Sequence, residues 1–371
     1  MCKGFSVGHK HAAILEQLRA TIVGGELPPG SKLPTHDELK RRYAASRATI
    51  QGVIDELRDQ GFVRSKGRAG TVVSDAPPHL CRYGFAVPQH PDTDPDGWPG
   101  FIVSLTSEAI ALQDGRARMD IPIFYGLEEK GAGGQGKEGH DYAALSEQVA
   151  AHRLAGVIFA YAPFNLRGSP IMETPGIPRV TLMRDVEIPG TCVVFPDLAS
   201  FIDKALDYLE SRGRRRIGIV SVPETKVFMN YLAASIARRQ LETRPYWTQI
   251  VSHRIGPGVL HTVELLMNKE HPCRPDGLVI TDDNLVPHAT AGLIAAGVSV
   301  PQEVDVVAHC NFPRPTPSML EVKRLGFDAR DVLKACIARI DEQRRGETPQ
   351  PLTLIPAYFD DEIEAKRRDR A

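Results

Sequence analysis

The sequence predicts an α/β protein with a small helical domain at its N-terminus and two lobes of parallel sheet behind it. The chain has 371 residues, a length that suggests two or three domains. Hydrophobic residues make up 42% and charged residues 25%, as in ordinary folded proteins. Beyond residue 80, β-type runs alternate with helical runs, which is the pattern of parallel sheets covered by helices.

The near-balance of charge conceals an asymmetry. The whole chain has 45 basic and 46 acidic residues, but residues 1–80 contain 12 basic and 8 acidic ones. The N-terminal part is therefore basic and the remainder acidic. This distribution predicts an anionic partner for the N-terminal domain.

Several functional classes are excluded by what the sequence lacks. No apolar stretch approaches the roughly 20 residues that span a bilayer, and residues 1–10 contain no export signal. The six cysteines form no CxxC pair, and no H-E-x-x-H or G-x-S-x-G motif occurs. We therefore expect a cytoplasmic protein with no membrane partner, no metal and no cofactor, which is not an enzyme.

Three helices are expected near the N-terminus. Apolar residues at three- and four-residue spacing predict the first over residues 9–25. The stretch Thr35–Glu38 is a capping box, so the second helix begins at Pro34 or Thr35 and ends near residue 43. Ser46 can cap a third helix, whose apolar stripe ends near Gly61.

A short hairpin is expected to follow these helices. Residues 62–64 and 71–73 are β-type runs, and the loop between them contains glycines and two basic side chains. Three helices followed by a basic hairpin form a winged helix-turn-helix. Its partner is expected to be a double-stranded DNA operator, since basic residues gather on the third helix and on the wing. The alternative is that these charges are merely solvated and the domain docks to a protein.

The physics of DNA reading gives each part of this domain a role. The first turn of the third helix enters the major groove, where Arg47 can bond guanine or phosphate and Thr49 can contact phosphate or a thymine methyl group. Helix N-termini also attract phosphate. The expected DNA-binding residues are Thr35, His36, Ser46, Arg47, Ala48, Thr49, Gln51, Lys66, Gly67 and Arg68.

Four segments, 27–34, 46–50, 61–63 and 67–73, carry a resemblance to a known family. In this order they resemble the DNA-binding domain of GntR-family bacterial transcriptional regulators, over about residues 9–74. The resemblance implies a DNA-binding transcriptional regulator. Two residues depart from the family pattern, because Asp37 and Gln51 stand where the family usually or commonly has Arg, and the family uses both positions on DNA.

The rest of the chain begins with a short linker over residues 76–81, where prolines favour extended backbone. The alternation behind it predicts strands and helices in turn. Strands are expected at 83–87, 119–125, 156–161, 179–182, 192–195, 216–222, 246–252, 277–281 and 304–309, and helices at 99–113, 141–153, 198–212, 229–241, 258–269 and 285–297.

Segments 154–158, 176–180, 209–218 and 297–307 resemble the effector-binding domain of the LacI/GalR repressors. That resemblance implies a LacI-type, two-lobed periplasmic-binding-protein-like fold with a ligand between the lobes. The expected domains are the winged helix-turn-helix over 9–75, the linker over 76–81 and the two-lobed effector and dimerisation domain over 82–360. Lobe one comprises about 82–188 and 314–346, and lobe two about 189–313 and 347–360.

Ligands of open α/β sheets bind at the carboxyl ends of the strands, where this chain has aromatic and polar residues. The expected effector-binding residues are Trp98, Phe101, Tyr125, Tyr161, Arg184, Asp197, Asn230 and Asp283. Five of them have an alternative role: the two aspartates can be helix caps, Trp98 and Tyr125 can be packing residues, and Arg184 can form a salt bridge between lobes.

The LacI-type repressors often have Arg near the start of the helix after the second lobe's second strand, and here Asn230 or Lys226 can substitute. We therefore expect a sugar-like or other small polar effector. The sequence as a whole predicts a ligand-responsive repressor, a homodimer that binds a pseudo-palindromic operator. The alternative is a cytoplasmic sugar-binding enzyme or transport component whose N-terminal domain docks to a protein.

Overall fold

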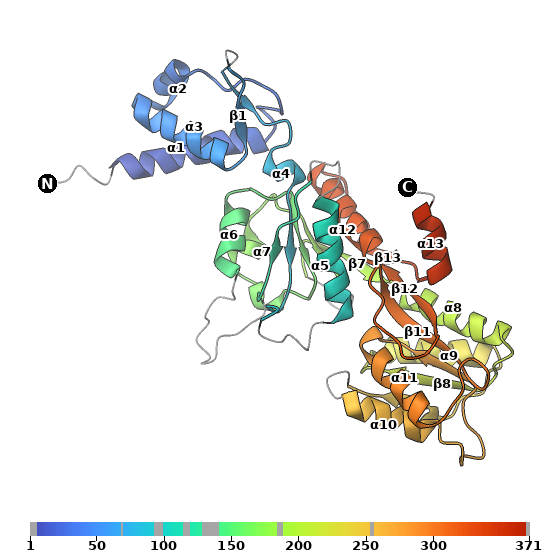
Figure 1. The fold of residues 1–371 in the computed structure, drawn as a ribbon. Coiled ribbons are helices and arrows are strands. Elements are labelled where there is room, and N and C mark those ends of the chain that lie inside the picture. The colour runs from blue at the N-terminus through green and yellow to red at the C-terminus, as the bar shows by residue number, and fades with distance from the viewer. Residues whose placement is uncertain are drawn as a thin grey trace, which may run out of the picture. The chain divides into compact units, whose positions relative to one another are not determined.

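The N-terminal segment folds into helices and a hairpin where its caps predict them (Figure 1). The computed structural model describes residues 6–67, 70–92, 99–113, 119–127, 141–183, 188–252 and 256–368, with side chains from residue 9 onward. The elements α1 (Ser6–Val23), α2 (His36–Tyr43), α3 (Arg47–Asp59), β1 (Val63–Ser65) and β2 (Thr71–Val73) form what we call the winged head. Its two strands pair antiparallel.

Capping residues fix the N-termini of α2 and α3, the two helices expected to contact DNA. The Thr35 side chain accepts a hydrogen bond from the Glu38 N–H, and the Glu38 carboxylate accepts one from the Thr35 N–H at 2.7 Å. The Ser46 hydroxyl accepts from the Thr49 N–H at 3.1 Å and so caps α3. These bonds satisfy N–H groups that have no partner within the helix, and the predicted capping box is confirmed.

One apolar core holds the winged head together. Its most buried side chains come from all the elements of the head and include Leu18, Leu39, Ile50, Leu57 and Phe62. The core fixes α3 by its apolar stripe, so the opposite face of this helix is left exposed.

A first sheet of mainly parallel strands follows the head. It has six strands in the order β13-β7-β6-β5-β3-β4, and the four registered pairs among β3 to β7 are parallel. These strands are β3 (Tyr83–Ala86), β4 (Ile123–Phe124), β5 (Gly156–Phe159), β6 (Arg179–Thr181), β7 (Thr191–Pro196) and β13 (Leu352–Ile355). The accompanying helices are α4 (Pro78–Cys81), α5 (Gly100–Gln113), α6 (Tyr142–Ala150) and α7 (Pro170–Glu173).

A second sheet has the order β14-β12-β11-β10-β8-β9, and only its β12–β14 pair is antiparallel among the described strands. Its strands are β8 (Ile217–Ser221), β9 (Thr248–Ile250), β10 (Gly277–Ile280), β11 (Asp305–Phe312), β12 (Lys323–Asp328) and β14 (Tyr358–Phe359). Separate apolar clusters pack α8 (Leu198–Ser211) and α9 (Lys226–Arg238) against one face, and α10 (Gly256–Leu266) and α11 (Val286–Ala295) against the other. The predicted parallel sheets covered by helices are confirmed.

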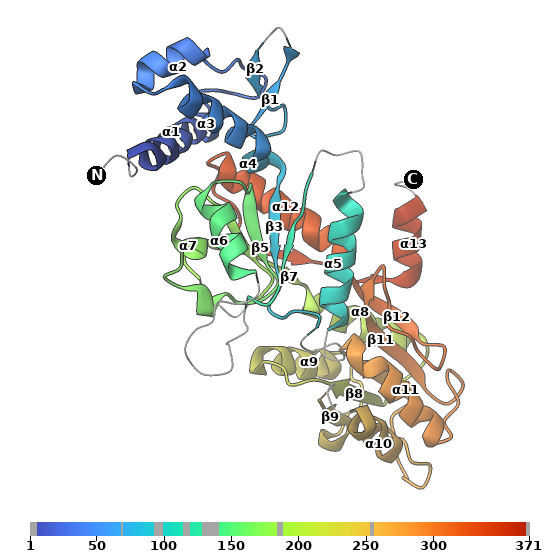
Figure 2. The ribbon, with the colours of Figure 1, turned by 60° about the vertical axis from the view of Figure 1, so that its left-hand side comes forward.

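The chain divides into two compact units. The first comprises residues 1–93, 110–193 and 336–351, and contains the winged head and most of the first sheet. The second comprises residues 94–109, 194–335 and 352–371, and contains the second sheet. Helices α5 and α12 (Ala329–Arg344) each contribute to both units, with residues 100–109 of α5 in the second, and α13 (Asp360–Arg368) belongs to the second (Figure 2).

Some sequence expectations were wrong in detail. The extended backbone expected after Asp75 fails at residues 78–81, which form α4, because proline at the first helical position needs no N–H partner and already has a helical φ. The strand expected over 119–125 is only β4, and Pro122 within it lacks an N–H for pairing. Helix α9 begins at Lys226, earlier than expected, because Thr225 caps it.

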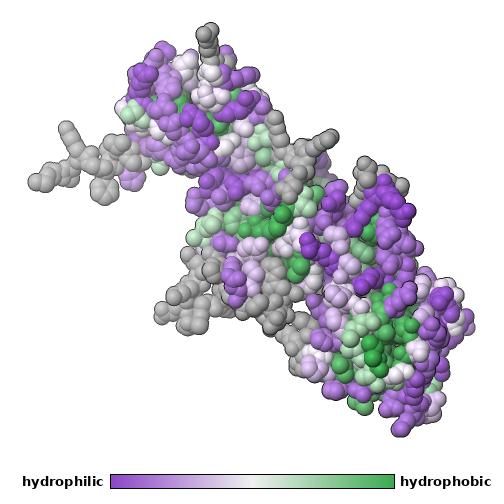
Figure 3. Space-filling view, viewed as in Figure 1, coloured by the Kyte–Doolittle hydropathy of each residue, from purple (hydrophilic) through white to green (hydrophobic). Residues whose placement is uncertain are grey.

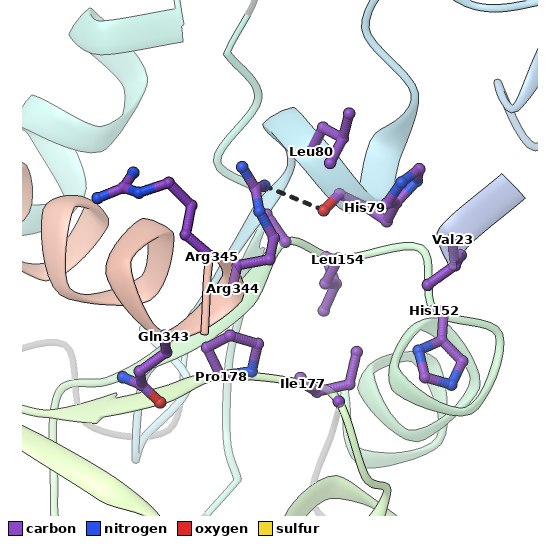
Figure 4. A pocket seen from close by; sticks show the side chains of 12 residues that line it. Val23, His79, Leu80, His152, Leu154, Ile177, Pro178, Gln343, Arg344 and Arg345 are labelled. Atoms are coloured by element: carbon purple, nitrogen blue, oxygen red, sulfur yellow. Dashed lines mark hydrogen bonds between the residues drawn. The ribbon is translucent and has the colours of Figure 1, made fainter. Parts of the chain in front are cut away.

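A pocket of about 660 Å³ lies within the first unit, where the winged head meets the first sheet (Figure 4). Its walls come from the end of α1, from α4, from the loop after α6 and from the C-terminus of α12. His79 is 8% exposed, stacks on Phe62 at 5.9 Å between ring centroids, and accepts a bond from Arg344 through its carbonyl oxygen at 3.1 Å. Burial, together with the nearby Arg344 and His152, lowers the pKa of His79 to about 4.

Candidate nucleic-acid interface and effector-binding wall

The exposed face of α3 presents the residues expected to read DNA. Arg47 and Ala48 in the first turn are exposed, as is the capping Ser46, and Thr49 is partly exposed. Thr35 and His36 lie at the N-terminus of the neighbouring helix α2. The first turn of α3 has no acidic residue, so its unbonded N–H groups and positive dipole end favour a phosphate, whereas the first turn of α2 contains Asp37 and Glu38.

Some basic residues of the winged head are paired with acidic residues and others, including two of the predicted DNA contacts, are not. Arg58 is paired with Asp55 at 2.6 Å and Arg64 with Asp75 at 2.8 Å, so their charges are largely neutralised within the protein. Arg47 and Lys66 are both exposed and form no ion pair with any residue that the structure describes. These two cations, one on the recognition helix and one on the wing, are therefore available to an external anion. Hydrophilic side chains cover most of the visible surface of the head (Figure 3).

The wing is closed by backbone geometry that requires glycine. Gly67 has φ +56° and Gly70 has φ +85°, values that side chains rarely adopt, and the Lys66 N–H donates to the Gly70 carbonyl at 2.8 Å. Lys66 directly follows β1, at the start of this tight loop. Arg68, the other predicted contact of the wing, lies outside the described residues.

Gln51 is exposed on α3 but its amide is engaged by neighbours. Its Oε1 lies 2.8 Å from His36 Nε2, and its Nε2 donates to Asp55 Oδ1 at 2.9 Å. The sequence prediction named Gln51 and His36 as independent DNA contacts and missed this link. The four-residue spacing of Gln51 and Asp55 along one helix was the available signal.

The second unit has a polar wall at the carboxyl ends of its central strands. Ser221 ends β8 and accepts a hydrogen bond at 2.7 Å from Thr281, which follows the neighbouring strand β10. Asp283 lies two residues after Thr281 and is only 2% exposed. Its Oδ2 accepts a hydrogen bond from the Thr316 hydroxyl at 3.1 Å, and its Oδ1 lies 4.0 Å from His309 Nδ1. We call Ser221, Thr281, Asp283, His309 and Thr316 the effector wall.

Burial raises the pKa of Asp283, although the charge of His309 opposes this shift. A buried carboxylate with few hydrogen-bond partners destabilises the fold. Carboxylates whose pKa is shifted by burial are common at binding sites. Asp282, not Asp283, is the local cap, since its Oδ1 accepts from the Asn284 N–H at 2.9 Å. The cap reading of Asp283 is therefore wrong.

Gly100, at the start of α5, is part of the same wall. Its N–H donates to Asn284 Oδ1 at 3.1 Å, and a Cβ at this position would overlap the Asp283 carboxylate. Only glycine lets the helix approach so closely. Phe101 follows it and is half-buried. Sequence reasoning found Phe101 but missed Gly100, His309 and Thr316. The only available signal was the Pro99–Gly100 pair at the start of a helix, which pointed to Gly100.

The other predicted effector residues have more varied surroundings. Asp197 caps α8 by accepting from the Ser200 N–H at 3.2 Å, and Asn230 is exposed on α9. In the first unit, Tyr125 packs edge-on against His90 at 5.7 Å, whereas Tyr161 is 6% exposed within an apolar cluster. Two further predicted residues, Trp98 and Arg184, lie outside the described residues.

Among the described residues, no three His, Cys, Asp or Glu side chains come together in a way that could bind a metal ion. The helices described by the structure include none with the length and apolarity to cross a membrane.

Comparisons with known proteins agree with both halves of this geometry. Residues 10–73 match the model of the bacterial regulatory proteins of the gntR family, and residues 206–357 match the periplasmic binding protein-like domain. The arabinose metabolism transcriptional repressor of Halalkalibacterium halodurans is 35% identical over 362 residues, which cover 94% of each chain. The repressor NagR of Bacillus subtilis is 40% identical over 62 residues, 16% of this chain and 25% of its own.

Solved structures show the same fold for the larger part. A LacI family regulator from Arthrobacter sp. FB24 in complex with lactose matches with a TM-score of 0.55 and 17% identity, over 75% of this chain and 97% of its own. A LacI family regulator from Lactobacillus casei with bound glucose matches with a TM-score of 0.51 and 16% identity, over 75% and 98%. The chain thus belongs to the GntR-type transcriptional repressors that join a winged helix-turn-helix to a periplasmic-binding-protein-like domain, and it is a ligand-responsive DNA-binding regulator.

Proposed function

We propose that this chain represses transcription as a homodimer on a pseudo-palindromic operator, and that a neutral sugar releases or strengthens this binding in the cytoplasm. The observation that carries the DNA part is the pair of exposed cations, Arg47 and Lys66, which no described acidic side chain neutralises. Phosphates would supply the missing counter-charge, and the position of Arg47 at the start of α3 supports a contact in the major groove.

Selection of bound sequences from a random duplex library, followed by an affinity measurement across a salt series, tests this part. The selected sequences are expected to contain two related half-sites. The logarithm of the association constant is expected to fall linearly with the logarithm of salt concentration, since binding releases counterions from the phosphates. A flat salt dependence would contradict the proposal.

A second copy of the chain is needed to present two heads to a two-fold operator. Two helices of the second unit expose large apolar side chains that suit such a contact: Leu265 on α10 is 67% exposed and Ile294 on α11 is 46% exposed. Hydrophobic residues gather over this part of the molecule in Figure 3. Sedimentation of the wild-type chain should give a dimer, and Leu265→Lys should shift it towards monomer.

The effector wall supports a neutral, hydroxyl-rich ligand. The buried Asp283 carboxylate can accept hydrogen bonds from sugar hydroxyls, whereas it repels a phosphate or a second carboxylate. Asn230, at the position where related repressors often have Arg, adds hydrogen-bonding capacity without charge. Since a relative that matches over 94% of the chain is named an arabinose metabolism transcriptional repressor, a free pentose is the first ligand to test.

The ligand is bound and released unchanged in this proposal, in keeping with relatives that are regulators. The test is the shift of the thermal unfolding midpoint on adding arabinose, other free sugars and a sugar phosphate. Free sugars are expected to raise the midpoint and the sugar phosphate is expected to leave it unchanged. A response to the phosphate alone would contradict the assignment of a neutral effector.

A further inference from the structure

The amide of Gln51 is held on both sides before any DNA arrives. His36 Nε2 lies 2.8 Å from its Oε1, and its Nε2 donates to Asp55 Oδ1 at 2.9 Å. Asp55 also accepts a bond from Arg58 Nη1 at 2.6 Å. We call these four residues the Gln51 network. It links the first turn of α2 to the exposed face of α3.

Asp55 determines which way the amide points. A carboxylate only accepts hydrogen bonds, so the group facing it must be the amide NH₂ of Gln51. The reversed amide would bring two acceptor oxygens together. Oε1 must therefore face His36, whose Nε2 donates the hydrogen bond. Gln51 thus enters any complex with its orientation already fixed, and less side-chain entropy is lost on binding.

The Gln51 side chain lies on the face of α3 that the fold leaves for a partner. The opposite face of α3 packs into the core of the head through Ile50, Val53, Ile54 and Leu57. Arg47 and Gln51 are both exposed and stand four residues apart, or about 6 Å along the helix axis. A helix whose N-terminal turns enter the major groove therefore brings Gln51 to base edges within roughly two base pairs of Arg47.

The remaining hydrogen-bonding capacity of Gln51 matches one base. An amide has two acceptor lone pairs and two N–H donors, and the Gln51 network uses one of each. One acceptor and one donor are left. Adenine offers the complementary pair in the major groove, an N6–H donor beside the N7 acceptor. Guanine offers two acceptors, cytosine only a donor, and thymine an acceptor beside a methyl group.

We propose that Gln51 reads an adenine in each operator half-site, and that His36 and Asp55 are positioning residues for this contact. The inference rests on the DNA binding proposed above and extends it to the base that is recognised. It also explains what Gln supplies at a position where related regulators commonly have Arg, since Arg bonds guanine in the same way that Gln bonds adenine.

Selection from a random duplex library with the wild type, Gln51→Ala and Gln51→Arg tests the proposal. The wild type is expected to prefer adenine at one position of each half-site by about 5- to 150-fold, as for one bidentate base contact. Gln51→Ala should lose that preference alone, and Gln51→Arg should change it to guanine. Unchanged preferences in Gln51→Ala would overturn the inference. A wild-type chain that enriches no sequence would instead contradict DNA recognition altogether.

Two variants of His36 test the positioning role. His36→Ala should flatten the adenine preference severalfold while affinity for duplexes with other bases at that position changes little. His36→Gln can still donate a hydrogen bond to Oε1 and should retain the preference. Thermal midpoints of both variants serve as the folding control. An equal loss of affinity for every duplex in His36→Ala would show a merely structural role and would refute positioning.

Discussion

Acid should weaken the junction between the winged head and the first sheet, and His79 is the residue that should cause it. His79 is 8% exposed and its imidazole stacks on Phe62, and Nδ1 of the ring has no hydrogen-bond partner among the described residues. A protonated ring at this position would lose hydration and would face Arg344. The neutral form is therefore the folded form.

The magnitude follows from the pKa of His79, which burial lowers from 6.5 to about 4. Since the unfolded chain binds this proton more readily, the stabilising effect of neutral His79 is complete above pH 6.5. It is lost as the pH falls from 6.5 towards 4. This difference in pKa corresponds to at most about 3 kcal/mol, of which about 1–2 kcal/mol is lost between pH 7.5 and pH 5.

Urea unfolding at pH 7.5 and pH 5 measures this loss of stability. Hydrogen exchange at residues 78–81 and in the winged head, at the same two pH values, shows whether the loss lies in the first unit. His79→Phe keeps the ring stack without a titrating group, so the stability difference between wild type and variant should change by about 1–2 kcal/mol between the two pH values. His261→Gln, on the exposed surface of α10, is the control and should behave as the wild type. An identical pH dependence in His79→Phe would refute the reasoning.

Three further substitutions separate the parts of the molecule. Arg47→Ala should weaken operator binding and lower the slope of the salt dependence by about 0.9 if it contacts one phosphate, while the sugar-induced shift of the unfolding midpoint stays intact; an unchanged affinity would contradict its role. Asp283→Asn should keep or raise the unfolding midpoint, because it removes a buried charge, yet abolish the sugar-induced shift; a normal shift would contradict the effector wall. Thr35→Ala should destabilise α2 by about 1 kcal/mol through loss of the capping box, measured by hydrogen exchange in that helix, and an effect within error would show that the cap contributes little.

Local signals made the winged head predictable. The signals for the capping box at Thr35 and the cap at Ser46 lie in the residues themselves, so the start of α3 follows from the sequence and that of α2 was predicted within two residues. The alternation of strands and helices beyond residue 80 also follows from local sequence patterns. The last part of the chain was not predicted, since no strand or helix was assigned beyond residue 309, and β12, α12 and α13 were missed. Asp328, whose side chain accepts a hydrogen bond from the Arg330 N–H at 3.0 Å, was an available signal for the start of α12.

The effector wall was predictable only where residues follow strands directly. Asp283 stands just after a strongly apolar strand and was found, but His309 lies within β11 and Thr316 in the loop beyond it. Their approach to Asp283 is a tertiary contact with no spacing rule behind it. The Gln51 network shows the same limit, since half of it, Gln51 with Asp55, follows helix periodicity and the other half, the bond to His36, depends on how α2 packs on α3.

The central claim is that one chain couples a sugar site to a DNA-binding head. Its most direct test is the affinity of the wild-type chain for its selected operator, measured by fluorescence anisotropy at fixed salt with and without saturating free sugar. A coupling free energy of about 1–3 kcal/mol predicts a change of about 5- to 150-fold in that affinity. Equal affinities in the presence and absence of a sugar that demonstrably binds would contradict the account.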